Sequence, residues 1–141
     1  MRLCPNVGSA RRGASAVEFA VVAPLLVFMI VVAVDFARGF RTAQIVMAAA
    51  RNGALYGSDN PAKASDTAGI QAAALAETVD FPSPPTVTSQ TGADADGIPF
   101  VQVTVSYPFQ TITRFPGVSS STTVSRTVQM RVAALLPLGS N

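Results

Sequence analysis

Residues 11–36 read RRGASAVEFAVVAPLLVFMIVVAVDF, and the rest of the chain has to be understood around this apolar run. Sixteen consecutive residues, 19–34, carry no charge and no amide. At 1.5 Å per residue, 16 to 21 helical residues span roughly 24–32 Å, which matches a bilayer hydrocarbon core of about 30 Å. The sequence therefore predicts one membrane-spanning helix, at about residues 16–36.

Two residues inside the run are unusual for a membrane span. An ionisable residue costs roughly 2.5–3.5 kcal/mol at the bilayer centre and less near the interface, so Glu18 is a candidate functional residue. Pro24 removes one backbone hydrogen-bond donor and is predicted to kink the helix, which membrane helices tolerate.

Three other uses of an N-terminal apolar run remain open on the residues alone. A cleaved secretory signal would end at Ala33, although Glu18 and Pro24 are atypical of such signals. A twin-arginine export signal would use Arg11 and Arg12, but the residues that follow lack the expected apolar character. A plain uncleaved anchor fits the length of the run and leaves Glu18 unexplained.

The charges around the run do not fix its orientation. Cytoplasmic flanks of membrane helices carry an excess of lysine and arginine. Here three arginines precede the run and three follow it: Arg2, Arg11, Arg12, Arg38, Arg41 and Arg51. The pair that adjoins the run favours a cytoplasmic N-terminus, but only weakly.

The composition bounds the function of this 141-residue chain, which is long enough for one small domain beyond the run. There is no histidine, which excludes histidine acid–base catalysis and the commonest metal ligand. The single cysteine, Cys4, cannot form an intramolecular disulfide. The first 13 residues hold three of the ten basic residues and no acidic one, so the net charge of the remainder falls from +2 to −1. We expect no enzymatic activity, cofactor, metal, nucleic acid or small-molecule substrate.

The helix is predicted to continue beyond the membrane to about residue 57. Small and apolar residues recur there at spacings of three and four, as on one helical face: Phe36, Phe40, Ala43, Met47, Ala50 and Ala54. Such a face could admit a neighbouring helix at close range or cover the core of its own domain. The segment GSDNP at residues 57–61 is a stop signal for the helix.

A second helix is predicted at residues 64–79, capped by Ser65 or Asp66. The prolines at 82, 84 and 85 then forbid further helix.

After these prolines the hydrophobic pattern has period two, which predicts strands at 86–89, 100–107 and 122–132. Residues 92–97 should form a solvated turn, because they lack the ligand spacing of a calcium loop. Pro108 would end the second strand or place it at a sheet edge. The predicted fold class is α+β, with a long N-terminal helix, a second helix and a small, mainly antiparallel β-sheet.

Several segments resemble the N-terminal motif of a known family. Residues 12–20 read RGASAVEFA, residues 23–26 read APLL, residues 35–38 read DFAR and residues 49–54 read AARNGA. Together they resemble the TadE-like family of tight-adherence (Flp-type) pilus systems, whose members are type IV pilin-like. The resemblance is specific across residues 11–57; beyond them it rests on architecture and on the closing strand.

This resemblance implies a division of the chain into three parts. Residues 1–13 would be a prepilin-like leader, removed by a prepilin peptidase between Gly13 and Ala14. Residues 14–57 would form the long helix that contains the membrane span. Residues 58–141 would form a small extracytoplasmic α+β domain.

The resemblance also assigns roles to single residues. Cleavage would free an amine on Ala14, and in pilin-like assemblies a glutamate at the position of Glu18 is thought to pair with that amine of a neighbouring subunit. Glu18 and Phe19 would thus belong to the processing motif and set the register of subunits. Four further residues occupy family-motif positions: Asp35, Arg38, Arg51 and Gly53.

The function that the resemblance implies is that of a minor pseudopilin-like subunit supporting assembly of an adhesive pilus. It would lie in the bacterial inner membrane with a cytoplasmic N-terminus and a periplasmic C-terminal domain, possessing no chemistry of its own. Its partners would be prepilin peptidase, other pilins and pseudopilins, the assembly platform and the lipid bilayer. Ala14 as first mature residue, the early Pro24 and the extra domain fit a minor subunit better than a filament-forming pilin. The alternative is an unprocessed single-span anchor that displays a periplasmic binding domain.

Overall fold

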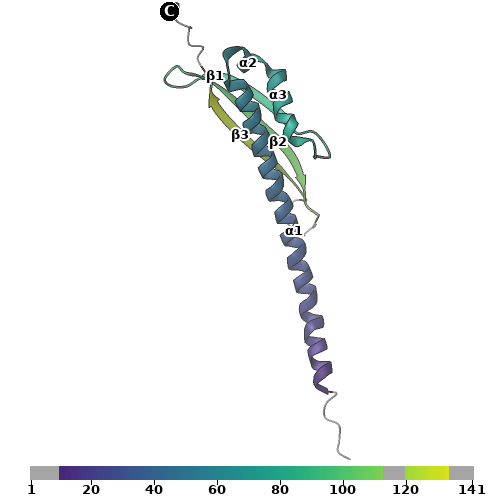
Figure 1. The fold of residues 1–141 in the computed structure, drawn as a ribbon. Helices are drawn as coiled ribbons and strands as arrows, with labels where there is room; N and C mark the ends of the chain where they lie inside the picture. Colours follow the sequence, from purple (N-terminus) through teal and green to yellow (C-terminus); the bar gives the residue numbers. More distant parts are fainter. Residues whose placement is uncertain (1–9, 113–119, 134–141) are drawn as a thin grey trace, which may run out of the picture. The chain divides into compact units, whose positions relative to one another are not determined.

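The computed structural model describes residues 10–112 and 120–133 (Figure 1). Contacts divide the chain into two compact units, one ending at Ala37 and the other beginning at Arg38. The elements are α1 (Ala10–Ser58), α2 (Pro61–Ser65), α3 (Thr67–Leu75), the 3-10 helix η1 (Ala76–Thr78), β1 (Thr86–Ala93), β2 (Pro99–Gln110) and β3 (Ser121–Arg131). The long apolar helix, the further helices and the small antiparallel sheet confirm the predicted α+β, pilin-like class.

The described part of the first unit is the portion of α1 that precedes Arg38. Large apolar side chains such as Val21, Leu25 and Ile30 are exposed there. A helix that is apolar all round is typical of a membrane span. The helix is long and apolar enough to cross a bilayer once, which suggests a single-pass membrane anchor.

The second unit begins within α1, and its helices lie on one face of a three-stranded sheet. Figure 1 shows α1 and α3 side by side over this sheet. The strand order is β1-β2-β3, and both neighbouring pairs are antiparallel. The core-facing side chains of β2 alternate with polar ones, and Val101, Val103 and Val105 are fully buried. Burying a side chain of this size contributes about 1.5–3 kcal/mol, so β2 is the centre of the core.

The face that α1 buries differs from the predicted one. Ala50 and Ala54 are buried, but Phe36, Phe40 and Met47 are exposed and Ala43 is half-buried, so most of this face does not cover the core of its own domain. The buried stripe consists of small residues: Val46, Ala49, Ala50, Gly53, Ala54 and Gly57. Close approach of the helix to the sheet requires small side chains, so the larger ones lie on the opposite side of the helix.

The two buried glycines of α1 mark where the backbones approach most closely. A Cβ atom on Gly57 would lie 3.0 Å from Cγ2 of Val101 and 3.1 Å from Cδ1 of Ile70. A Cβ atom on Gly53 would lie 3.2 Å from Cγ1 of Val103. All three distances are shorter than an ordinary van der Waals contact. Glycine is therefore used here for the space that it leaves free.

The predicted second helix is interrupted at Asp66, which separates α2 from α3. Asp66 has φ −84° and ψ 81°, outside the helical region, and its side chain accepts a hydrogen bond from the Gly69 amide. This confirms Asp66 as a cap. Asn60 caps α2 in the same way by accepting from the Lys63 amide, which is why a helix begins at Pro61, before the predicted start.

Pro108 does not end β2, which continues to Gln110. Pairing with β1 stops at Ser106, whereas pairing with β3 continues through Pro108, which lies opposite Thr123. The strand is central up to Ser106 and has one neighbour beyond it. The missing N–H of proline is tolerated because β2 is locally an edge strand at that point.

The turn between β1 and β2 is shorter than predicted, because Gly92 and Ala93 belong to β1. Asp94 closes the turn: its Oδ1 accepts hydrogen bonds from the amides of Asp96 and Ile98. Gly97 has a φ of 75°, which favours glycine. Arg131 Nη2 lies 2.8 Å from Oδ2 of Asp94 and fixes the turn to the end of β3.

Candidate functional site

The proposed processing residues lie together at the start of α1. Gly13 is in the helix, and a Cβ built on it would have no neighbour within 4 Å among the residues that the structure describes. Ala14, Glu18 and Phe19 are exposed, and so is Pro24 further along the helix. Among the residues that the structure describes, Glu18 forms no hydrogen bond or ion pair. This end of the chain thus offers an unpaired carboxylate within an apolar surface.

The DFAR motif positions differ in exposure. Asp35 is buried, whereas Arg38 is exposed on α1 at the beginning of the second unit. The Arg38 guanidinium lies over the ring of Phe109, with Cζ 5.6 Å from the ring centroid. This is a cation–π contact between α1 and the end of β2. Its aromatic partner is 71 positions away in the sequence, and no local pattern indicated it.

Arg51 and Gly53 lie on different sides of α1, although they are close together in the motif. Residues two positions apart on an α-helix are rotated by about 200° from each other, so Arg51 and Gly53 point in nearly opposite directions. Gly53 is buried against α3 and β2. Arg51 is exposed. Gly53 is therefore accounted for by packing within the second unit, and Arg51 lies on its surface.

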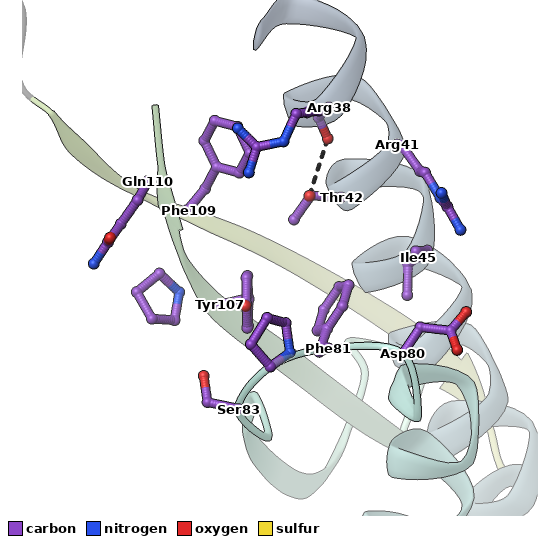
Figure 2. A pocket seen from close by; sticks show the side chains of 12 residues that line it. Arg38, Arg41, Thr42, Ile45, Asp80, Phe81, Ser83, Tyr107, Phe109 and Gln110 are labelled. Atoms are coloured by element: carbon purple, nitrogen blue, oxygen red, sulfur yellow. Dashed lines mark hydrogen bonds between the residues drawn. The ribbon is translucent and has the colours of Figure 1, made fainter. Parts of the chain in front are cut away.

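A pocket of about 510 Å³ lies in the second unit between α1, the loop that follows η1 and the end of β2 (Figure 2). Phe81 and Tyr107 form its floor, with ring centroids 4.2 Å apart and planes tilted by 35°. Arg38 and Arg41 come from α1, and Asp80 from the loop. No local sequence pattern predicts this pocket, because its lining residues come from segments far apart in the chain.

Two charged residues of the pocket come from different segments, Arg41 from α1 and Asp80 from the loop that follows η1. Arg41 and Asp80 both line it, but within the described ranges no salt bridge joins them to each other or to another residue. In the view of Figure 2, the side chain of Ile45 lies between them. The pocket is therefore lined by a separate carboxylate, an aromatic pair and two arginines, which Figure 2 shows extending to opposite sides of α1.

Other carboxylates of the domain serve its structure. The amide of Gly69 and the hydroxyl of Tyr56 donate hydrogen bonds to Asp66 and hold the pKa of its carboxyl below the usual value. The amide of Ile98 does the same for Asp94 and lowers its pKa, with help from Arg131. In residues 10–112 and 120–133 no group of three or more acidic, cysteine or histidine side chains is placed to hold a metal ion.

Residues 13–55 match the family model described as TadE-like protein. The match confirms the resemblance over this segment, which contains every proposed motif residue from Gly13 to Gly53. TadE-like proteins are associated with Tad/Flp pilus systems, and the family is typically structural rather than catalytic. Comparisons with curated proteins and with solved structures gave no match.

The TadE-like segment also contributes one wall of the pocket. Arg38, Arg41, Thr42 and Ile45 lie inside residues 13–55, while the aromatic floor and Asp80 lie outside. The pocket combines the matched helix with the part of the chain that the family model leaves uncovered.

Proposed function

We propose that this protein is a minor pseudopilin-like membrane subunit that supports assembly of an adhesive Tad/Flp-type pilus. The proposal rests on one observation: the segment that matches the TadE-like family is also a helix whose exposed, apolar first half can cross a membrane. The helix would act by packing against other subunits in the bilayer, and the second unit would contact further proteins outside it.

Processing at Gly13 is the first step that we propose. A prepilin peptidase would remove residues 1–13 on the cytoplasmic side of the inner membrane and free the amine of Ala14. A narrow protease groove favours glycine, which has no side chain.

Glu18 would then set the axial register between subunits. A carboxylate in an apolar environment is strongly disfavoured unless it is paired. After cleavage, the new amine of a neighbouring subunit would provide the partner that Glu18 lacks in the described part of this chain. Neighbouring helices would therefore be favoured in the one register that brings the two groups together.

The proposed topology follows from the processing site. With Gly13 on the cytoplasmic side, the single span places the second unit in the periplasm. Other pilins, pseudopilins and the assembly platform would be the partners. No reaction is assigned to the protein itself.

The experiment is intact-mass analysis of the full-length protein from membranes of cells with and without prepilin peptidase. We expect loss of residues 1–13 only when the peptidase is present. A Gly13→Leu variant should remain uncut in both strains, and Gly8→Leu, within the leader, is the control. An uncut form in both strains would support the single-span anchor instead. A soluble product that begins at Val34 would indicate an exported protein and overturn the proposal.

A further inference from the structure

The outer side of α1 in the second unit is not used by the core of this chain. Phe40, Met47 and Leu55 lie there with 60%, 42% and 48% of their surfaces exposed. The opposite side of the same helix carries the small residues that pack against β2 and α3. Single exposed apolar residues are ordinary, but several gathered on one surface mark an interaction site.

The three apolar residues follow one line along the helix. They are seven and eight positions apart, close to two helical turns, so they recur about every 11 Å. Gln44 and Arg51 occupy the turns between them, and both are exposed. Together these five residues form the outer stripe of α1. A row of side chains at spacings of three and four positions is matched by a second α-helix that lies along it.

The charge of the outer stripe indicates the chemistry of that second helix. Arg51 forms no salt bridge among the residues that the structure describes. Residues 36–58 contain three arginines and no acidic residue, so this part of α1 is uniformly positive. A guanidinium that a partner covers together with apolar side chains loses water, and a carboxylate must then pair with it. The partner helix therefore needs apolar residues and an acidic one.

A second copy of this chain does not supply the acidic residue. In a symmetric parallel pair of α1 helices, Arg51 would face Arg51 of the other copy, and like charges placed together repel. Sliding the two helices past each other does not help, because residues 36–58 hold no carboxylate. The next one, on Asp59, is already paired with Lys63 at 2.7 Å. The occupant that the charges favour is a different protein.

We propose that the outer stripe binds an acidic amphipathic α-helix of a different protein. The apolar side chains of that helix contact Phe40, Met47 and Leu55, and an aspartate or glutamate on it pairs with Arg51. The inference rests on the proposed function for the existence of a protein partner outside the bilayer, and it adds the chemistry of that partner. It requires neither leader cleavage nor the pairing of Glu18.

The test uses the full-length protein in its native membranes, with photoreactive p-benzoylphenylalanine in place of Met47. After irradiation, mass spectrometry identifies the cross-linked peptide. We expect a peptide of a different protein that has apolar residues at helical spacing and an acidic residue within four positions of the cross-link. The same photoreactive group in place of Val79, which is 83% exposed but outside α1, should not capture this peptide. A cross-link to a second copy, to lipid or to a peptide without an acidic residue, or no cross-link at all, would overturn the proposal.

Charge reversal tests the role of Arg51. Arg51→Glu should lower the yield of the Met47 cross-link at least tenfold, whereas Arg51→Lys should retain most of it. Arg126→Glu makes the same change at an exposed position on β3 and should leave the yield unchanged. Replacing the partner's carboxylate by a lysine should restore the cross-link to the Arg51→Glu protein. An unchanged yield with Arg51→Glu, in a protein whose circular dichroism is also unchanged, would refute the pairing.

Intact mass, measured on the same membranes, separates a failure of this inference from a failure of the proposed function. Normal removal of residues 1–13 without the Met47 cross-link would overturn the outer-stripe assignment alone. An uncut leader together with a cross-link that depends on Arg51 would overturn the pseudopilin proposal and support the helical partner.

Discussion

The hydroxyl of Tyr56 donates a hydrogen bond of 2.9 Å to Oδ2 of Asp66, which connects the last turns of α1 to the start of α3. The other carboxylate oxygen of Asp66 accepts from the Gly69 amide, also over 2.9 Å. One side chain thus caps α3 and fastens it to the long helix. The same bond raises the pKa of Tyr56.

This arrangement predicts that acid weakens the second unit. The pKa of Asp66 is lower in the folded chain than in the unfolded chain, so its stabilising contribution is present above the unfolded pKa, near pH 4. It is lost as the pH falls through the lowered, folded pKa. Thermal unfolding of the full chain in detergent between pH 7 and pH 2.5 should show this decline. Asp66→Asn keeps an acceptor for the Gly69 amide and should reduce the loss of thermal stability at low pH. Asp96→Asn is the control and should leave the Asp66 contribution in place.

Ile70 should be among the most sensitive positions of the domain. It is fully buried where α3 meets the glycines of α1. Ile70→Ala removes methyl and methylene groups from a packed site and should lower the free energy of unfolding by about 2–5 kcal/mol. Urea unfolding monitored by circular dichroism measures this change. Val79→Ala is the control, because Val79 is 83% exposed, and its effect should stay within about 0.5 kcal/mol. Equal effects of the two substitutions would contradict the packing described here.

Enlarging Gly53 should be destabilising even though it removes a poor helix former. Alanine favours a helix over glycine by about 1 kcal/mol, and leucine is nearly as good. Gly53→Leu, however, must fit a side chain where a single added Cβ would already lie 3.2 Å from Val103 and Ala74. We expect a net loss of about 1–3 kcal/mol in the same urea assay. Gln44→Leu on the exposed side of α1 should be close to neutral, and a stabilised Gly53→Leu protein would show that the helix can move away from the sheet.

Glu18 is predicted to matter for assembly and not for insertion. Replacing a carboxylate in a membrane segment by alanine removes its desolvation cost, so Glu18→Ala should still insert. We expect it to reduce surface pili at least tenfold, as counted by electron microscopy, because register between subunits is lost. Ser15→Ala in the same helix should leave pilus number unchanged. Normal leader processing together with normal pilus number in the Glu18 variant would remove the proposed role.

The fold was largely predictable because its main signals are local. The apolar run, the stop after Gly57 and the period-two segments each lie within short windows. The second and third strands lie within three residues of their predicted bounds, whereas β1 extends four residues beyond its predicted end. Asp66 was recognised as a cap, but the helix break that it creates was missed, since Asp66 lies within an otherwise helix-favouring segment. The buried face of α1 could not be selected from the sequence, because periodicity alone does not distinguish two faces when both carry apolar residues. The decisive factor was the size of the residues, and only the close approach of β2 and α3 makes size matter.

The site was predictable only in part. The motif at the start of α1 is continuous in sequence, so Gly13, Glu18 and Arg38 could be selected without a structure. The pocket could not be found in that way, because Arg41, Asp80 and Tyr107 are brought together by the fold. The contact between Arg38 and Phe109 depends on β2 continuing past Pro108. The strand accommodates the proline there because it pairs with a neighbour on one side only.

The glycine and alanine stripe of α1 also determines which mutations occur there, because substitutions that add volume far outnumber those that remove it. Ala49, Ala50, Gly53 and Gly57 already carry the two smallest side chains available, so almost every mutation at these positions adds volume. Mutations at these positions rarely create a cavity, which is the common defect in cores built from large residues. Their usual effect is a steric clash. Such a clash cannot be relieved at the mutated position itself, and it requires a smaller residue on β2 or α3. Substitutions on the helix should therefore be accompanied by compensating losses of volume at Ile70, Val101 or Val103.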